Sequence, residues 1–277
     1  MWPVKSPDFT AAKIAEVCAK GVREPSLAQR VRAEVRTLAS NSEEFQKIAK
    51  ASLCHTITSS QFPVDSISDA EFLWLYSERL VKSVSGKSIY NSLLQNATHG
   101  LCSYCQYGIA KTLDHFVPKS FAPTLAIDPW NLIPCCWECN HNLSSSFGTS
   151  PDEEFLHPFC LPDLGRWLFA EIQQTNPPTL SFWADPKVGL SPTIRARLIH
   201  QFDRLKLAEL YPVVAAGDLI NISGHAQILA EPSLIEEHLR EMALACAVKS
   251  VNSRQAVIYE ALAESPWFCG EGFRLVL

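Results

Sequence analysis

The first fifty residues alternate apolar and polar side chains with the period of an α-helix. Apolar positions recur there every three or four residues, at Leu27, Val31, Val35 and Leu38. Such spacing puts the apolar side chains on one face of a helix. Basic residues are interleaved with them, and a solvated face explains these better than a phosphate-binding face. Residues 8–53 are therefore predicted to be helical.

A second helical stretch is predicted after a connector rich in Ser and Pro. The segment 68–81 opens with Ser68, a residue type that commonly caps a helix N-terminus, and its apolar side chains recur four residues apart. Within this segment, Trp74 and Tyr76 are expected to lie in the core rather than to serve as platforms for stacked bases. A further short helix is predicted at residues 89–97.

The C-terminal part changes from strand-like to helical patterning. Two short apolar and aromatic segments flank a turn-rich stretch, which indicates a pair of strands. Three helices are predicted to follow, and the second opens with a capping-box pattern made by Ser233 and Glu236. The predicted strands are residues 166–172 and 179–185, and the first and third helices span about 192–216 and 253–263.

The middle of the chain, residues 101–160, behaves differently. It is rich in Cys, Pro, Asn and Ser, and its apolar periodicity is weak. Such a segment buries too little apolar surface to build a core alone. A bound metal ion is therefore expected to order it.

Composition and charge narrow the class of protein. The chain has 277 residues, of which 47% are hydrophobic, and a formal net charge of −5. It shows no apolar run that could span a membrane and no signal-peptide pattern, so a cytoplasmic protein with reduced thiols and no membrane partner is expected. The acidic balance and the lack of a Lys/Arg run count against strong nucleic-acid binding by this chain alone. They do not exclude chemistry on nucleic acids.

Two Cys-x-x-Cys knuckles provide the clearest chemical signal. Cys102 and Cys105 form the first knuckle, and Cys136 and Cys139 form the second. Four thiolates presented as two pairs satisfy the tetrahedral preference of a structural Zn²⁺. Cys135 offers an alternative register with Cys139, but that pairing leaves the less usual spacing of three residues. Cys135 is therefore interpreted as a packing residue.

Polar residues around the knuckles point to a second metal. Asp114 and His115 follow the first knuckle, Asn131 precedes the second, and Asn140 directly follows its last cysteine. Carboxylate and amide oxygens suit a hard cation such as Mg²⁺ or Mn²⁺. A neutral imidazole beside that cation can take a proton from water. One zinc would thus order the scaffold while a second, exchangeable metal takes part in chemistry.

The order of these motifs resembles the HNH, or ββα-metal, nucleases of the zinc-knuckle type. The shared features are CxxC, then "LDHFVPKS", then "NLIPCC", then CxxCN and "HPF". The resemblance is specific over residues 101–143 and extends to about residue 160. It is strongest to bacterial HNH proteins such as the Septu-type anti-phage nucleases, which work beside an ATPase.

The resemblance implies an α+β protein that is predominantly helical, with a small embedded ββα-metal core. Its expected organisation is an N-terminal helical region at 1–97, the nuclease core at 98–160 and a C-terminal strand-plus-helix region at 161–277.

The resemblance also assigns roles to the site residues. His115 is the general base, Asp114 and Asn140 are the ligands of the catalytic Mg²⁺ or Mn²⁺, and Asn131 holds the loop and orients the histidine. The implied reaction is metal-dependent endonucleolytic hydrolysis of phosphodiester bonds, with DNA as the expected nucleic acid, in the setting of antiviral defence.

The chain departs from the family pattern at one position. The family often continues CN-x-x-Lys, whereas Leu143 stands at that position here. Lys119 and Lys111 are candidates to supply the missing cation. His141 is an alternative to Asn140 as a metal ligand, although Asn140 is preferred. His157, in the "HPF" match, is interpreted as a structural histidine that ties the tail to the hairpin.

Two other function classes remain open at the sequence level. The chain could be a zinc-stabilised module that binds nucleic acid or protein and whose nuclease site has decayed, since the family lysine is missing. It could also be a scaffold subunit whose helical flanks bind a larger ATPase, a role that is compatible with nuclease activity. Plasmid nicking with and without a divalent metal separates the first class from an enzyme.

Overall fold

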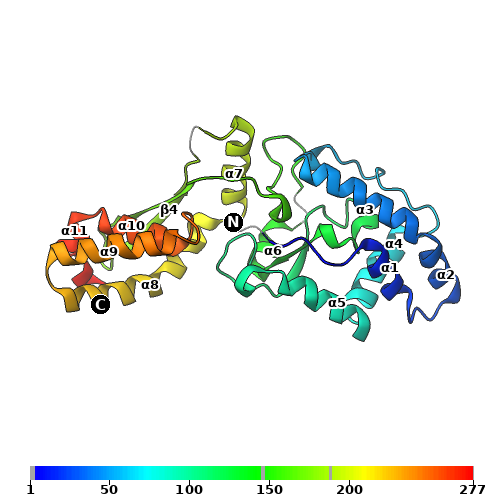
Figure 1. Cartoon of the computed structure of the whole chain (residues 1–277), viewed down its shortest axis with the longest axis horizontal. Helices are drawn as coiled ribbons and strands as arrows, with labels where there is room; N and C mark the ends of the chain where they lie inside the picture. The colour runs from blue at the N-terminus through cyan, green and yellow to red at the C-terminus, as the bar shows by residue number, and fades with distance from the viewer. Residues whose placement is uncertain (1–3, 145–146, 187–188, 277) are drawn as a thin grey trace. The chain divides into compact units, whose positions relative to one another are not determined.

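The computed structural model describes residues 4–144, 147–186 and 189–276. Within these ranges the protein is α+β, because helices predominate and the strands form two separate two-stranded sheets (Figure 1). The prediction of a mainly helical α+β protein is confirmed at this level. The chain divides into two compact units, Met1–Pro162 and Asp163–Leu277.

The first unit runs from a series of helices into a short hairpin and a final helix. The hairpin strands β1 and β2 are antiparallel, and Asp114 lies opposite Ile133. The elements are α1 (Ala11–Ala19), α2 (Pro25–Ala33), α3 (Val35–Lys50), α4 (Asp69–Trp74) with a π-helical continuation (Leu75–Val81), α5 (Val84–Gln95), β1 (Thr112–His115), β2 (Leu132–Cys135) and α6 (Trp137–Leu143).

The stretch 8–53, which was predicted to be helical, contains the three helices α1, α2 and α3. Gly21 follows α1 with a φ of +103°, a conformation that side chains disfavour, and a Cβ there would lie 2.7 Å from a guanidinium nitrogen of Arg79. Arg79 in turn donates hydrogen bonds to the carbonyl oxygens of Cys18 and Lys20. The chain therefore turns at Gly21 before α2 begins.

The segment after the connector begins as predicted. Ser68 caps α4, and Ser68 and Glu71 form a reciprocal capping box. Tyr76 is 9% exposed, so its predicted place in the core is confirmed. The prediction for Trp74 is wrong, because 40% of its surface is exposed. Trp74 follows the buried Phe72 by two residues and so lies about 200° further around the helix, away from the core-facing side.

The helical core of the first unit supports the hairpin directly. Leu113 of β1 and Leu132 of β2 belong to the same buried cluster as Ile14, Phe72 and Leu93. The backbone N–H of Leu113 also donates a hydrogen bond to the hydroxyl of Tyr90 on α5, at 3.1 Å. The hairpin is thus held against the helices by packing and by this hydrogen bond.

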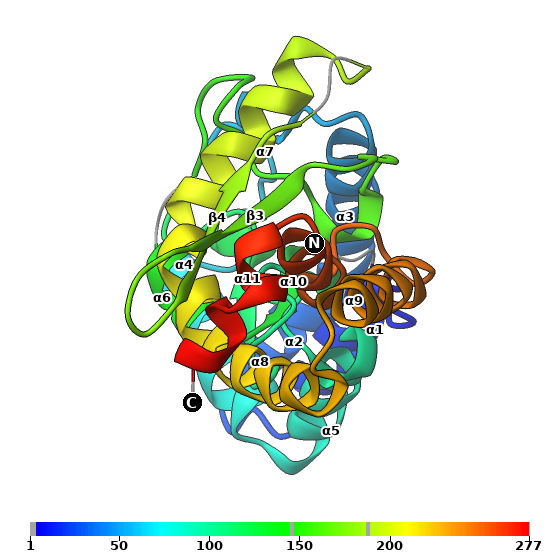
Figure 2. The same ribbon diagram turned by 90° about the vertical axis from the view of Figure 1, so that its left-hand side faces the viewer.

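The second unit contains a longer hairpin covered by helices. Strands β3 and β4 pair antiparallel, as predicted, and helices α8, α9 and α10 contact one another (Figure 2). The elements are β3 (Leu168–Gln173), β4 (Thr179–Ala184), α7 (Pro192–Arg204), α8 (Leu207–Leu229), α9 (Pro232–Ala247), α10 (Arg254–Ala263) and α11 (Pro266–Gly270).

Two helix boundaries of the second unit differ from the prediction. The helix expected over 192–216 is interrupted at Lys206, which takes the left-handed conformation with φ +54° and separates α7 from α8. The capping box predicted from Ser233 is wrong. Helix α9 begins at Pro232 after Glu231, because proline has no N–H to satisfy and suits the first turn of a helix.

Candidate metal centre and adjoining polar site

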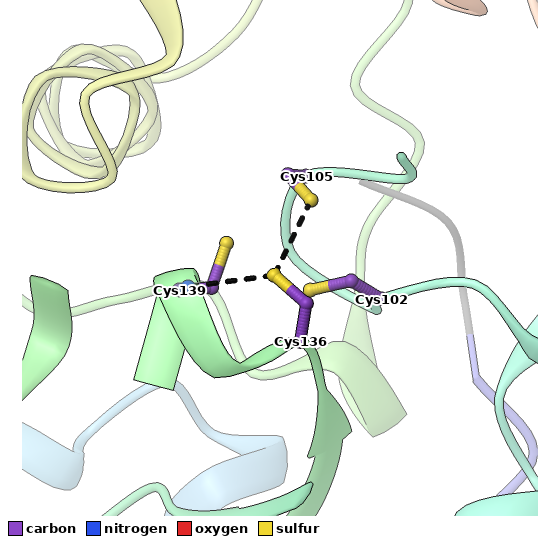
Figure 3. A group of neighbouring side chains, drawn as sticks. All are labelled: Cys102, Cys105, Cys136 and Cys139. Carbon is purple, nitrogen blue, oxygen red and sulfur yellow. Dashed lines mark hydrogen bonds between the residues drawn. The ribbon is translucent and has the colours of Figure 1, made fainter. Parts of the chain in front are cut away.

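The four knuckle cysteines meet in a compact, buried cluster (Figure 3). The sulfur atoms of Cys102, Cys105, Cys136 and Cys139 all lie within 4.8 Å of one another. The Sγ atoms of Cys105 and Cys136 are 3.9 Å apart. Four thiolates at about 2.3 Å from a tetrahedral zinc lie about 3.8 Å from one another. The cluster therefore has the donor chemistry and the spacing to hold a metal ion such as zinc.

The first knuckle is a tight turn closed by backbone hydrogen bonds. The N–H of Cys102 donates to the carbonyl of Gly108 at 2.7 Å. The N–H of Gly108 donates to the Sγ of Cys105 at 3.3 Å. A Cβ on Gly108 would lie 2.5 Å from the Cβ of Cys136. Glycine is therefore required where the two knuckles approach each other.

The second knuckle is formed by the start of α6. Cys136 is the N-cap residue of that helix, and its sulfur accepts a hydrogen bond from the N–H of Cys139 at 3.4 Å. A helix N-terminus favours negative charge, so this position suits a thiolate. Backbone N–H groups thus support one sulfur in each knuckle.

The thiols influence one another strongly when no cation is present. Burial, above all, raises the pKa of Cys102, whereas hydrogen bonding, first of all with Cys102, lowers the pKa of Cys105. The cluster therefore favours a thiolate that is stabilised by neighbouring thiols. Ionisation of all four sulfurs requires a cation among them.

Cys135 lies outside the sulfur cluster although it adjoins Cys136. Its side chain is fully buried, and its Sγ lies 3.3 Å from the Oγ1 of Thr112 on β1. Burial raises its pKa well above the ordinary value for a thiol. The structure thus brings the sulfur of Cys136, not that of Cys135, to the other three cysteines.

One face of β1 carries a polar group next to the cluster. Thr112 and Asp114 are two residues apart and share a face of the strand. The side-chain amide of Asn140, on α6, donates a hydrogen bond to the Oγ1 of Thr112 at 3.1 Å. The hydroxyl of Tyr104 donates to the Oδ2 of Asp114 at 3.0 Å. Asp114 and Asn140, the predicted ligands of the second metal, therefore lie on one side of the hairpin.

Asp114 is held in a dry environment. It is 5% exposed. Burial raises the pKa of its carboxyl to about 6, and the hydrogen bond from Tyr104 and the charge of Lys119 oppose that rise. A buried carboxylate with an elevated pKa gains much from a cation, because the cation offsets the cost of its ionisation. Its chemistry and that of the Asn140 amide fit a hard divalent metal.

The imidazole of His115 is fixed by one hydrogen bond and one ring contact. Its Nε2 donates to the carbonyl oxygen of Ala126 at 3.0 Å. The ring of Tyr76 packs against it edge to face, with centroids 4.5 Å apart. Burial lowers the pKa of His115 to about 4. The ring is therefore neutral near pH 7, and the Ala126 contact leaves the lone pair on Nδ1.

Asn131 holds the loop that contains this carbonyl. It is fully buried, its Oδ1 accepts from the N–H of Val117 at 2.7 Å, and its amide donates to the carbonyls of Val117 and Leu125. Leu125 directly precedes Ala126, which accepts from His115. Asn131 thus acts on the imidazole through the loop backbone, since its side chain bonds to the main chain of Val117 and Leu125.

The two lysines that could replace the missing family lysine lie in different surroundings. Leu143 is 3% exposed, so its position faces the protein interior and is unsuitable for a lysine. The ammonium of Lys119 lies 4.7 Å from the centre of the Tyr76 ring, the same ring that contacts His115. Lys111 is exposed at the start of the hairpin, and its N–H donates to the carbonyl of Cys135. Lys119 is therefore the lysine with a defined contact beside His115.

Two further histidines have distinct surroundings. His157 is buried, its Nε2 donates to the carbonyl of Trp130 at 3.2 Å, and its Nδ1 accepts from the N–H of Phe159. These contacts tie the segment after α6 to the chain before β2. His141 is exposed and stacks on Trp137, whereas Asn140 reaches Thr112.

Sequence reasoning missed three contributors to this site. Tyr76 and the carbonyl of Ala126 carry no local motif, because tertiary packing alone brings them to His115. Tyr104 lies inside the first knuckle, within the stretch "CSYC", and its polar hydroxyl was the one signal that could have identified it. A tyrosine between the two cysteines of a knuckle requires a hydrogen-bond partner when it is buried.

Comparison with known proteins gives one distant relative. The chain is 24% identical over 174 residues to the protein Ea31 of Escherichia phage lambda, an alignment that covers 61% of this chain and 58% of that protein. The chain thus spans well under two thirds of the relative it matches. No family model matches the chain, and no solved structure matches it. Among the described residues, no helix is both long and apolar enough to cross a membrane.

Proposed function

We propose that the protein is a metal-dependent endonuclease of the HNH type that hydrolyses phosphodiester bonds, with DNA as its expected substrate. One observation carries the proposal: a half-buried, neutral His115, fixed through Nε2, follows Asp114 on a strand that Asn140 also contacts. Metal-dependent hydrolysis of a phosphodiester needs a general base and, beside it, oxygen ligands for a divalent metal.

The zinc-type cluster supplies the scaffold for that arrangement. Its second knuckle contains Cys136 and Cys139, and Asn140 is the next residue on α6. Its first knuckle leads directly into β1, which carries Asp114. A structural metal would therefore fix the strand and the helix that present the two ligands. This dependence explains why one short segment contains both motifs.

His115 activates the attacking water in the proposed mechanism. Its Nδ1 lone pair accepts the proton, while the Nε2–H remains bonded to Ala126 and stabilises the imidazolium that forms. Asn131 keeps that carbonyl in place through its bonds to the loop. When bound by Asp114 and Asn140, Mg²⁺ or Mn²⁺ supplies charge neutralisation at the phosphate oxygens. Lys119 adds a positive charge near His115, since both side chains contact the ring of Tyr76.

The proposal extends to a biological setting through the sequence resemblance alone. The similar bacterial HNH proteins include Septu-type anti-phage nucleases that work with an ATPase. We therefore place this protein in antiviral defence, with an ATPase subunit as its expected partner. The net charge of −5 supports a need for a partner, because an acidic chain attracts nucleic acid poorly.

The alternative is a zinc-stabilised module whose nuclease site has decayed. Leu143, where the family often has lysine, favours that alternative, but the side chain there is buried and Lys119 offers a cation elsewhere. Asp114, His115, Asn131 and Asn140 are all present and hydrogen-bonded. A site that had lost its nuclease activity would not be expected to retain all four of these residues.

The test is plasmid nicking by the zinc-loaded protein with Mg²⁺ or Mn²⁺, and again after a chelator. Wild-type protein should nick only with the added metal. His115→Ala should reduce cleavage by at least about a hundredfold, the usual contribution of a general base, and should retain Mn²⁺ binding in calorimetry. Asp114→Ala should weaken that binding. His225→Ala, which alters an exposed histidine of the second unit, is the matched control. Equal cleavage by His115→Ala and wild type would refute the mechanism.

A further inference from the structure

Helix α6 displays an aromatic stack on its outer face. Trp137 is 63% exposed, although indole side chains usually bury most of their surface. Its ring lies parallel to the imidazole of His141, with an angle of 3° between the planes and centroids 5.1 Å apart. The two residues are four apart on the helix, so they share one face. The core of the unit does not use them, because α6 buries Cys139 and Leu143 instead.

The turn of the first knuckle borders this stack. Gly108 lies against the first residues of α6, since a Cβ added to it would meet Cys136 at 2.5 Å and a carboxylate oxygen of Glu138 at 3.8 Å. The residues on either side of it, Tyr107 and Ile109, are 42% and 62% exposed. Exposed aromatic and apolar side chains therefore continue from the helix onto the adjoining turn.

The stack is also close to the proposed site of chemistry. Asn140 lies three residues after Trp137, and its side chain is held by Thr112 on the strand that carries Asp114. One turn of an α-helix rises about 5.4 Å. A nucleotide whose phosphate lies at Asp114 and Asn140 can therefore place its base within reach of the Trp137 ring.

We propose that Trp137, backed by His141, is a stacking platform for an unpaired nucleobase next to the bond that is cut. Single-stranded or locally unpaired nucleic acid is then the preferred substrate, because a base inside a duplex already stacks on its neighbours and offers no free face. The position of the phosphate in this inference rests on the proposed nuclease function. Stacking on the indole does not depend on base identity, so the platform selects for an unpaired base rather than for a sequence.

The binding test uses the zinc-loaded full chain carrying His115→Ala, in Mg²⁺, so that no probe is cut. The probes are a fluorescent twelve-nucleotide oligothymidylate and a twelve-base-pair duplex, followed by anisotropy. Adding Trp137→Ala should weaken oligothymidylate binding by about 5- to 150-fold, the usual contribution of one stacked base. The duplex should be affected much less. Trp137→Phe should restore most of the affinity, and the slope of affinity against salt should not change, since no phosphate contact is removed.

Trp183→Ala is the matched control, because Trp183 is 41% exposed and lies on β4 of the second unit. It should leave binding of both probes unchanged. Zinc content and the melting temperature show that each variant folds. An equal loss of affinity for single strand and duplex, or no loss for either, would overturn the platform. So would a Trp137→Ala variant that binds oligothymidylate normally but loses a co-purifying protein, which would make this surface a protein contact.

The platform and the nuclease proposal can fail separately. If binding depends on Trp137 but wild-type protein cuts neither probe in Mg²⁺ or Mn²⁺, the nuclease proposal fails and the platform stands. If wild-type protein cuts both probes equally and Trp137→Ala changes neither binding nor cleavage, the platform fails and the nuclease proposal stands.

Discussion

Lys119 is the lysine best placed to supply the cation that the family pattern has at the position of Leu143. Its ammonium packs on the Tyr76 ring beside His115, whereas the position of the family's lysine, Leu143, points into the interior. Aromatic contact restricts the flexible lysine side chain, which otherwise loses entropy when it binds a phosphate. A cation held in this way can replace one supplied by α6.

Lys119→Met is expected to weaken nucleic-acid binding to a similar extent for every sequence and to reduce cleavage. If Lys119 contacts one phosphate, the slope of log affinity against log salt should become shallower by about 0.7 on single-stranded DNA and by about 0.9 on duplex DNA. Binding titrations at several salt concentrations measure this slope. Lys87→Met, on the exposed side of α5, is the matched control, and Lys111→Met tests the other candidate. A larger effect for Lys111→Met than for Lys119→Met would reverse the assignment.

His157 leads to a prediction about stability and pH. Burial lowers its pKa from 6.5 to about 3. Between pH 3 and pH 6.5 the His157 imidazole is therefore protonated in the unfolded chain but not in the folded protein. Its neutral form contributes fully to the free energy of unfolding above pH 6.5, and this contribution is lost as the pH falls toward 3. At pH 4.5 the loss is about 2–3 kcal/mol.

Urea denaturation of wild type and His157→Gln at pH 7.5 and pH 4.5 measures this effect. Glutamine cannot be protonated, so the stability advantage of wild type over the variant should shrink by about 2–3 kcal/mol between the two pH values. The buried Asp128, whose pKa burial raises to about 6, titrates equally in both proteins and cancels in the difference. An advantage that stays constant would show that His157 ionises normally in the folded protein.

At the scale of elements, the metal cluster joins a turn to a helix. Cys102 and Cys105 come from the knuckle turn before β1, and Cys136 and Cys139 come from the first turn of α6. Besides the cysteines, the two knuckles bury one large side chain, that of Tyr104. The free energy of metal binding is therefore expected to be a large part of what orders this region.

Cys136→Ser should remove the bound zinc and lower the melting temperature, whereas Cys135→Ser should keep about one zinc per chain. The reason is that the Cys136 sulfur is in the cluster while the Cys135 sulfur contacts Thr112. Metal analysis after dialysis against a weak chelator measures the zinc, and Cys246→Ser in the second unit is the control. Zinc loss in Cys135→Ser with retention in Cys136→Ser would move the knuckle by one residue.

Short sequence patterns correctly predicted those helices and strands that are determined by residues adjacent in the sequence. The helix cap at Ser68, the pair β3 and β4, and the helix at 254–263 follow from neighbouring residues. The break at Lys206 was missed, because a left-handed lysine leaves the apolar spacing around it intact. Likewise, four cysteines at paired spacing predict a cluster. The contact between Tyr76 and His115 instead depends on tertiary packing, because Tyr76 and the hairpin residues Leu113 and Leu132 share one buried core.

At the scale of the whole molecule, charge is the main obstacle to nucleic-acid chemistry. The chain carries 24 Lys and Arg residues against 29 Asp and Glu residues, which gives the net charge of −5. Each phosphate contact depends on a cation and on counterion release, so affinity falls steeply with salt. A few placed groups, such as Lys119 and the Trp137 stack, can orient a strand but cannot attract it from a distance.

We therefore expect weak, strongly salt-sensitive nucleic-acid binding by the isolated protein, and efficient cleavage only when a partner presents the substrate. The partner should contact the helical flanks rather than residues 101–143, because the site must remain open. A cleavage assay near physiological salt, with the protein alone and with its co-purifying partner, measures the difference. Lowering the salt about fourfold should partly replace the partner, since weaker screening strengthens attraction to the few cations that are present. Rapid cleavage by the protein alone at physiological salt, unchanged when the partner is added, would show that this chain recruits its substrate without help.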